Sequence, residues 1–599
     1  MSPTDSYTPI PPWPRSHYCG TLRATDEGRE VALWGWVAAR RDHGGVIFID
    51  LRDREGIVQL VFKPESEAAG ARAAAGAARA EFYLAAKGWV VRRSDNTINP
   101  QLPTGEIEII VASAEILSAS AALPFQLGAG AENTAEEVRL KYRYLDLRRP
   151  EMQDNLRRRH QALRGARAWL DGQGFIEVET PILCRATPEG ARDYLVPSRV
   201  NPGKFYALPQ SPQLFKQLLM VGGFDRYYQI ARCFRDEDLR ANRQPEFSQI
   251  DIEMTGPRLD DIMGVAEGMM ASIYEYALGV KLAPPFIRMP FEEAQERFGS
   301  DKPDLRFELE LKNLTAAFAG TSFKVFAEVL ERGESIYALA LPAEYQLSRR
   351  ELDELVEMLR AQKSLGLAWA KTVESGWQGP LARHISAAER QAAERAAGLA
   401  AGGTLLIMAG PQALVRPILG DLRLQLAGKF ELRDASALKF LWIVDFPLFE
   451  YSEEQRRMTS VNHPFTAPRP EDLHLLESDP AQARALAYDL VLNGQEMGGG
   501  SIRIHNPELQ LKVFELLGLG REEAVSRFGF LIDALGYGAP PHGGIAFGVD
   551  RIAMMVCGAN SLRYVMAFPK TQKAVDPMSG APSEVEAHQL KELSIKVAL

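Results

Sequence analysis

The sequence predicts a multidomain α+β protein with a small N-terminal β-barrel, a larger domain built on antiparallel strands, and an inserted α+β domain. Three observations lead to this prediction. Residues 17–118 read as short strands separated by turn residues. Residues 139–300 and 433–565 contain densely charged loops between strand patterns, whereas residues 301–432 are rich in Ala and Glu and lack such loops. A chain of 599 residues is long enough for more than two domains.

The barrel prediction rests on five strand patterns and one helix. An Ala-rich helical stretch at 67–82 separates the third strand from the fourth, which is typical of a small OB barrel, although several β folds share the pattern. The five strands are expected at 30–42, 45–53, 56–62, 83–94 and 105–117. A linker is expected at 119–138. A helix over 157–174 and a strand over 175–180 follow it.

The composition is that of an ordinary soluble protein, with 46% hydrophobic and 25% charged residues. No apolar run approaches the roughly 18–20 residues that span a bilayer. The Pro-rich residues 1–16 show no signal peptide, and we expect a flexible tail there. The four cysteines form no CxxC pair, so neither a zinc site nor a disulfide framework is predicted, and a cytoplasmic location fits.

The net charge of −9 excludes a globally basic surface, so a nucleic acid would need a local one. Residues 139–167 are one candidate, although a solvated helix face would have the same composition.

The densest charge lies between two strand patterns at 227–234 and 247–254. Residues 235–243 hold three arginines and three acids, and Arg235 directly follows the first strand. In the second strand Gln249, Asp251 and Glu253 share one face, which is expensive to bury without partners. A solvated hairpin is one interpretation, and a binding site for a polyanion with a metal is the other.

A second hairpin is predicted by Asn493-Gly494, a tight-turn signal. It would bring together Asp489 and Glu496, and a carboxylate pair beside phosphates is a usual way to hold Mg²⁺. Arg503 follows three glycines, and its planar fork suits a carboxylate. A glycine-rich hairpin with surface charges is the alternative.

Two helices carry a cation in an unusual place. Asp550-Arg551 opens an apolar helix, where an arginine opposes the helix dipole unless an anion binds there. Lys216 lies among Leu214, Phe215 and other apolar residues. A helical lysine is usually at the surface, but these neighbours also allow a buried ammonium group.

These stretches resemble the three motifs of class II aminoacyl-tRNA synthetases. Residues 174–196 resemble motif 1, "CFRDEDLRANRQPEFSQID" resembles motif 2, and "HGGIAFGVDRI" resembles motif 3. From about residue 15 to 599 the chain resembles the bacterial type of the aspartyl-tRNA synthetase family. The resemblance implies an antiparallel catalytic sheet of six to seven strands and a homodimer. It also implies an anticodon-binding OB domain (17–118), a hinge (119–138), catalytic halves (139–300 and 433–565), an insertion (301–432) and a C-terminal extension (566–599).

The resemblance also assigns site residues. It implies three catalytic residues, Arg235, Glu237 and Arg551, and a metal pair, Asp489 and Glu496. The implied ATP site consists of Arg235, Asp236, Glu237, Gln244, Glu496, Gly548, Val549, Asp550 and Arg551. The implied aspartate site consists of Glu189, Ser211, Gln213, Leu214, Phe215, Lys216, Arg235, Asn462, His463 and Arg503. Many family members have His where this chain has Asn462, which changes one substrate contact.

In the OB domain, Phe48 and Gln59 are implied to stack on and read anticodon bases. His43 and Asn96 match positions linked to tRNA choice. Family members with Leu at the first position tend to be restricted to tRNA-Asp, and those with His tend to accept tRNA-Asn too. Relaxed enzymes often have Gly at the second position, so the two signals conflict; we favour relaxed charging.

The implied activity uses ATP and Mg²⁺ to convert L-aspartate to aspartyl-adenylate, with release of pyrophosphate, and transfers the aspartyl group to tRNA-Asp, and to tRNA-Asn under the relaxed hypothesis. Four alternatives remain. They are a strictly tRNA-Asp-specific enzyme, a synthetase of the same subclass for another amino acid, a non-catalytic RNA-binding paralogue, and an amide-forming ligase without a tRNA partner.

Overall fold

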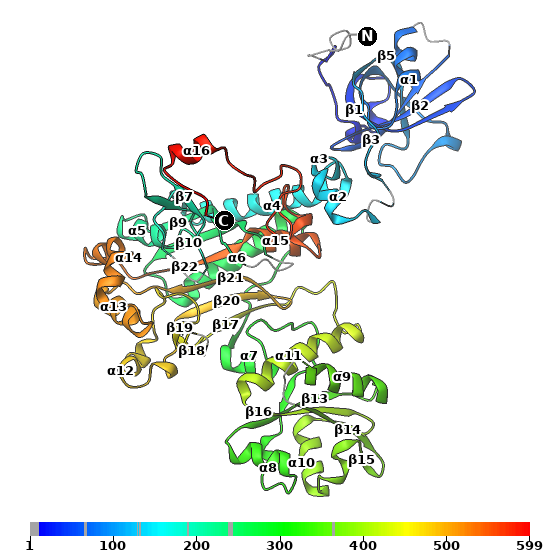
Figure 1. The fold of residues 1–599 in the computed structure, drawn as a ribbon. Helices are drawn as coiled ribbons and strands as arrows, with labels where there is room; N and C mark the ends of the chain where they lie inside the picture. Colours follow the sequence, from blue (N-terminus) through cyan, green and yellow to red (C-terminus); the bar gives the residue numbers. More distant parts are fainter. Residues whose placement is uncertain are drawn as a thin grey trace. The chain divides into compact units, whose positions relative to one another are not determined.

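The structure is a computed structural model, and it describes residues 11–64, 69–128, 130, 133–187, 191–237, 243–361, 366–453 and 455–598. The chain divides into two compact units, Met1–Arg158 with Asn560–Glu584, and Arg159–Ala559 with Val585–Leu599. Each unit is described here by itself (Figure 1). The fold class is the predicted one: an N-terminal OB barrel, an antiparallel catalytic sheet and an inserted α+β domain.

The first unit contains a closed barrel with the strand order β1-β2-β3-β5-β4. Its strands are β1 (Glu30–His43), β2 (Val46–Asp53), β3 (Gly56–Phe62), β4 (Tyr83–Arg92) and β5 (Ile107–Ser118). Helix α1 (Ala69–Ala77) follows the third strand, as the Ala-rich stretch predicts. Alternate residues of β2 point into the core, because successive side chains of a strand face opposite sides. Residues 11–16 of the expected tail include Ser16, whose N–H donates to the carbonyl of Ala32.

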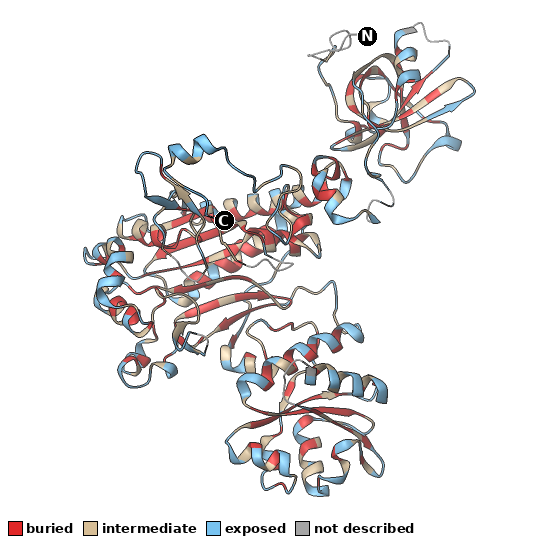
Figure 2. Ribbon diagram, in the orientation of Figure 1, coloured by how far each residue is buried: buried red, intermediate tan, exposed pale blue. Residues whose placement is uncertain are grey.

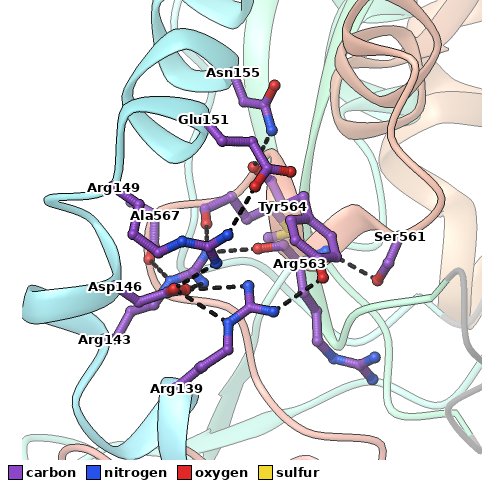
Figure 3. Close-up of polar contacts among 11 residues, drawn as sticks. Arg139, Arg143, Asp146, Arg149, Glu151, Asn155, Ser561, Arg563, Tyr564 and Ala567 are labelled. Carbon is purple, nitrogen blue, oxygen red and sulfur yellow. Dashed lines mark hydrogen bonds and ion pairs between the residues drawn. The ribbon is translucent and has the colours of Figure 1, made fainter. Parts of the chain in front are cut away.

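Two short helices follow the barrel, α2 (Glu136–Lys141) and α3 (Arg143–Asp146). The longer helix α4 (Pro150–Gly172) begins after them. Here Asp146 is fully buried and accepts hydrogen bonds from Arg139, Arg143 and Arg149 (Figure 3). Arg143 also donates to the carbonyls of Arg563, Met566 and Ala567, at 2.5–2.8 Å. These arginines of the basic stretch are therefore buried, and they tie the segment after residue 560 to the helices.

Replacing Asp146 with Asn tests this cluster. Removing the carboxylate leaves the buried guanidinium groups of Arg139 and Arg143 without their anion, whereas Arg149 keeps Glu151, and we expect this to cost about 3–5 kcal/mol. Thermal unfolding should show a lower midpoint for the first unit. Asp154→Asn is the matched control, because Asp154 is exposed and pairs only with Arg157. Equal midpoints for D146N and D154N would contradict the prediction.

The second unit is built on an eight-stranded sheet with the order β11-β17-β20-β21-β22-β10-β9-β6. The six central strands are antiparallel, and the short edge strands β11 and β6 pair in parallel. The strands are β6 (Ile176–Glu177), β9 (Arg226–Phe234), β10 (Glu246–Thr255), β11 (Ile287–Pro290), β17 (Phe440–Val444), β20 (Ala487–Leu492), β21 (Gln495–Ile502) and β22 (His542–Gly548). The strand expected over 175–180 is thus only two residues long.

One face of this sheet is covered by α4, α6 (Leu259–Leu278) and α15 (Val549–Cys557). Ile250, Ile252 and Met254 of β10 point into that core, so the alternate residues of the strand face the other side. Figure 2 shows the central strands as buried. On the other side lie α5 (Gln213–Val221), α13 (Pro507–Leu516) and α14 (Arg521–Leu535), which share a small core. Among the described helices, none is long and apolar enough to cross a membrane.

The inserted domain lies in sequence between β11 and β17, two neighbouring strands of the large sheet. Its own sheet has the order β12-β13-β16-β14-β15. The strands are β12 (Leu311–Asn313), β13 (Ser335–Leu341), β14 (Leu367–Val373), β15 (Gly376–Gln378) and β16 (Thr404–Gly410). Helices α9 (Arg349–Ala361) and α11 (Gln412–Lys429) cover one face, and α8 (Lys324–Glu331) and α10 (Ala387–Ala397) cover the other. Helix α7 (Phe291–Phe298) connects β11 to this domain.

Candidate active site

A buried cluster of four charged residues lies on the face of the large sheet that carries α5. Asp251 and Glu253 of β10 are fully buried, and Lys216 of α5 contacts both, at 2.7 and 3.2 Å. Arg503 forms two parallel hydrogen bonds with Glu253, from Nε at 3.0 Å and from Nη2 at 3.1 Å. The ammonium of Lys216 is thus buried, and the polar row of β10 finds its partners in the protein's own cations.

Further groups line the same cluster. Arg503 Nη1 donates to Ser501 Oγ at 2.7 Å and contacts His463 Nε2. Gly544 of β22 makes room for Glu253, because a methyl group on this glycine would lie 2.1 Å from Glu253 Oε2. Burial raises the pKa of Asp251. Burial would also raise the pKa of Glu253, but Arg503 and Lys216 outweigh it and lower that pKa. Glu253 therefore stays ionised between the two cations.

His463 makes the protein sensitive to acid. Burial lowers the pKa of His463 well below 6.5, and the charges of Arg503 and Lys216 act in the same direction. The unfolded chain then binds more protons than the folded one below about pH 6.5, so stability should fall as the pH drops through that range. Urea unfolding at pH 7.5 and 5.5 should show a smaller loss for His463→Asn than for the parent. An equal loss in both would contradict the prediction.

Arg235 follows the end of β9, where motif 2 begins. Its guanidinium carbon lies 5.0 Å from the centre of the Phe247 ring, and its buried Nε has no hydrogen-bond partner among the described residues. Gln244 is buried nearby in sequence, and Glu237 pairs with Arg243 at 2.5 Å. Residues 238–242 lie outside the described residues. A buried charged donor without a partner points to an anionic ligand, since such a group is costly to leave unpaired.

The backbone of Asp236 pairs with that of Arg192, whose carbonyl accepts from the Asp236 N–H at 3.0 Å.

The rest of the aspartate set lies on two segments. Ser211, Gln213, Leu214 and Phe215 lie at the start of α5, where Gln213 is buried and its Nε2 has no described partner. Asn462 precedes His463, and its Oδ1 is also buried without a described partner. Glu189 lies outside the described residues.

The predicted hairpin joins β20 and β21. Asn493 and Gly494 have φ of +51° and +81°, as the tight turn requires. Burial raises the pKa of Asp489 well above its ordinary value, and the charge of Glu496 adds to this shift. The two carboxylates thus act on each other. No cluster of three or more metal-binding side chains occurs in the described part of the chain. Two carboxylates are the kind of ligand that Mg²⁺ takes together with phosphate and water oxygens.

Motif 3 forms β22 and the start of α15. Gly548 precedes the helix, and Val549 and Asp550 are buried in its first turn. Asp550 accepts from Arg159 at 2.5 Å and from the Ser248 N–H at 3.2 Å, which joins the helix start to α4 and β10. Arg551 is partly exposed, donates to the Glu496 carbonyl and lies 4.0 Å from its carboxylate. Arg551 is thus beside the carboxylate pair.

Three of the four tRNA candidates, His43, Phe48 and Gln59, lie on neighbouring strands of the barrel. Phe48 is half-buried on β2, and Gln59 lies opposite Asp50 on β3, so both side chains share one face. The His43 ring lies edge-on to Phe48 with centroids 6.0 Å apart. Asn96 is exposed in a short 3₁₀ turn, Asp95–Thr97.

Sequence reasoning did not assign Asp251, Glu253 and Ser501 to the site. The polar row of β10 was a usable signal, because three polar residues on one strand face need partners. The identity of those partners was not readable, since Arg503 is 250 residues from Glu253 in the chain.

Comparison with known proteins agrees with this geometry. The family of class II tRNA synthetases for D, K and N matches residues 135–572, and an OB-fold nucleic acid binding domain matches residues 31–117. The chain is 52% identical over 585 residues to an Aspartate--tRNA(Asp/Asn) ligase from Caldanaerobacter subterraneus subsp. tengcongensis, covering 98% of each chain. It is 50% identical to a protein of the same name from Desulfatibacillum aliphaticivorans, covering 97% of this chain and 98% of the other.

Among solved structures, asparaginyl-tRNA synthetase from Pyrococcus horikoshii, complexed with asparaginyl-adenylate, shares the fold. The TM-score is 0.58 with 20% identity, and the match covers 93% of this chain and 98% of the other. The chain belongs to the class II aminoacyl-tRNA synthetases, in the subclass for aspartate, lysine and asparagine.

Proposed function

We propose that the protein is an aspartate–tRNA ligase that forms aspartyl-adenylate from L-aspartate and ATP and transfers the aspartyl group to tRNA-Asp and tRNA-Asn. The observation that carries this proposal is the cationic pocket of Lys216 and Arg503, held by Asp251 and Glu253. The names of the relatives support the choice of aspartate and of both tRNAs.

The pocket suits a carboxylate side chain. The ammonium group of Lys216 and the guanidinium group of Arg503 can only donate hydrogen bonds. The side-chain carboxylate of aspartate can accept these bonds, whereas the amide N–H₂ of asparagine is itself a donor and would face other donors. A site built on such polar partners rejects an analogue by about 10⁴–10⁵. The remaining residues of the aspartate set, including Ser211, Gln213, Asn462 and His463, would line the rest of the pocket, and the contact of His463 with Arg503 supports this.

For ATP, we propose that Arg235 binds the α-phosphate and Arg551 the γ-phosphate. Glu237, Gln244 and the start of α15 would line the nucleotide. Asp489 and Glu496 would hold Mg²⁺, which supplies charge neutralisation on the phosphates when bound.

In the first step, an α-carboxylate oxygen of aspartate bonds to the α-phosphorus of ATP. The bond from this phosphorus to the bridging oxygen breaks, and pyrophosphate leaves. Arg235 donates to oxygens on which negative charge grows, and its fixed position accounts for much of the acceleration. In the second step, a hydroxyl of the terminal ribose of tRNA attacks the aspartyl carbonyl carbon, and AMP leaves.

The barrel face with Phe48 and Gln59 would bind the anticodon, because an aromatic ring on a β-barrel stacks with unpaired bases. We further propose that motif 1 builds a homodimer and that the enzyme acts in the cytoplasm. The four cysteines are free in the described structure, which fits a reducing compartment.

The test is aspartylation of purified tRNA-Asp and tRNA-Asn side by side with Mg-ATP. We expect both tRNAs to be charged. Charging of tRNA-Asp alone would show a strictly specific enzyme, and charging of neither would contradict the proposed activity.

His43 provides a matched prediction on tRNA choice. Because His43 lies against Phe48, His43→Leu should lower kcat/KM for tRNA-Asn by about 10-fold and change tRNA-Asp by less than about threefold, since one base contact is worth ~1–3 kcal/mol. The measurement is steady-state charging of both tRNAs, with Asn96→Gly as the companion variant. Equal effects of H43L on the two tRNAs would show that His43 does not discriminate between them.

A further inference from the structure

A buried arginine of the inserted domain holds the loop that follows α7. Arg423 of α11 is 1% exposed. Its Nε donates to the carbonyl of Leu309 at 2.7 Å, and its Nη2 donates to the carbonyls of Asp304 and Phe307 at 2.9 and 3.0 Å. The guanidinium also stacks 3.9 Å from the Phe307 ring centre. One side chain thereby fixes three carbonyls within six residues of loop 299–310.

The helix that carries Arg423 is itself fixed against α7. Gly299 ends α7 with φ of +64°, and a methyl group on it would lie 2.0 Å from the Arg416 carbonyl oxygen. A methyl group on Gly420 would lie 2.8 Å from the carbonyl oxygens of Phe298 and Gly299. The two backbones therefore touch.

The other side of the loop packs on the hairpin turn of the candidate metal site. A methyl group on Gly494 would lie 3.2 Å from Asp304 Cβ. Asp304 is buried, and its carboxylate accepts from Arg306 at 2.7 and 2.9 Å. The strands on either side of this turn carry Asp489 and Glu496. A contact chain thus runs from Arg423 through Asp304 and Gly494 to the strands of the carboxylate pair.

We infer that Arg423 is a positioning residue for adenylate formation: the inserted domain, through Arg423 and loop 299–310, fixes the hairpin that presents Asp489 and Glu496 to Mg-ATP. The role of the hairpin in this inference rests on the proposed function. The inserted domain thereby acts on the first chemical step, although Arg423 contacts neither carboxylate in the described structure.

The experiment compares Arg423→Met and Arg423→Lys with Arg416→Met, all in the full chain. Arg416 is the matched control, because it is also a buried arginine of α11 but bonds to α7 and Tyr337 instead of the loop carbonyls. Hydrogen–deuterium exchange without ligands is measured over residues 299–310 and 487–502. In R423M we expect exchange in both segments to rise by about 10-fold, as the loss of loop hydrogen bonds predicts. R423K should lie between R423M and the parent, and R416M should leave the hairpin protected.

A second readout separates positioning from general stability. In ATP–pyrophosphate exchange, R423M should raise the half-saturating Mg²⁺ concentration by about 10-fold, as is usual for groups that orient metal ligands. The KM for aspartate should stay within about twofold, because Lys216 and Arg503 do not contact the loop. Mn²⁺ binding in the presence of ATP, followed by electron paramagnetic resonance, should weaken in parallel.

Unchanged hairpin exchange in R423M would overturn the inference, as would equal effects of R423M and R416M on the hairpin. Faster exchange with an unchanged Mg²⁺ dependence would overturn the link to the metal site. Failure of the proposed function has a different signature. The parent enzyme itself would then show no aspartate-dependent exchange, while the hydrogen-exchange comparison would still report on the contact chain.

Discussion

Replacing Arg503 with Lys should lower kcat/KM for L-aspartate in ATP–pyrophosphate exchange by about 10³-fold, equivalent to ~4 kcal/mol. Arg503 uses Nε and Nη2 on Glu253 and Nη1 on Ser501 and His463, so its fork holds together the residues of the proposed aspartate pocket. An ammonium group lacks the planar fork and cannot reproduce the two parallel bonds. Glu253 is fully buried, and in R503K its negative charge would lose part of the interaction that offsets the cost of burying it. The melting temperature should therefore fall together with the activity.

The matched control is Arg484→Lys. Arg484 forms the same two-bond contact with Asp472, but outside the pocket. R484K should leave the kinetics of aspartate activation within about twofold, because Arg484 is not among the proposed pocket residues. If R503K kept the parent's KM for aspartate, Arg503 would not bind the substrate.

The sequence allowed the barrel to be predicted nearly to the residue, because its strands are short runs rich in apolar residues that are separated by turn residues. The hairpin at Asn493-Gly494 was readable for the same reason: both residues tolerate positive φ. The residues of the segment itself determine strands and turns of this kind. The strand expected over 175–180 is shorter than predicted: it comprises Ile176 and Glu177, and Val178 adds one N–H bond to Tyr228 of β9. Whether an extended segment pairs depends on which neighbour the fold supplies.

The partners of the buried charges could not be predicted from local patterns. Lys216 is buried because two carboxylates of β10 lie beside its helix, and no spacing rule connects these segments. Likewise, the basic stretch 139–167 had the composition of a nucleic-acid surface, yet Arg139, Arg143 and Arg149 turn inward to one aspartate. Composition gives the number of charges, whereas the tertiary fold decides which of them pair within the protein and which are left for a ligand.

Arg235 gives the clearest test of whether a charged residue pairs within the protein or is left for a ligand. Its buried Nε has no described hydrogen-bond partner, so Arg235→Gln removes no bond at this atom. We expect kcat for ATP–pyrophosphate exchange to fall by about 10³-fold, as for other arginines that stabilise a transferring phosphoryl group. The melting temperature should change little, in contrast to R503K, because Arg503 has internal partners to lose.

Arg232→Gln is the control for this variant. Arg232 lies on β9, three residues before Arg235, but it is exposed and pairs with Glu246 at 2.7 Å. R232Q should keep the parent's kcat. A large loss of stability in R235Q would mean that Arg235 serves the fold, and an unchanged kcat would mean that the transition state does not use it. Only a loss of rate without a loss of stability fits the proposed role of Arg235 at the α-phosphate, in which its Nε has no hydrogen-bond partner among the described residues.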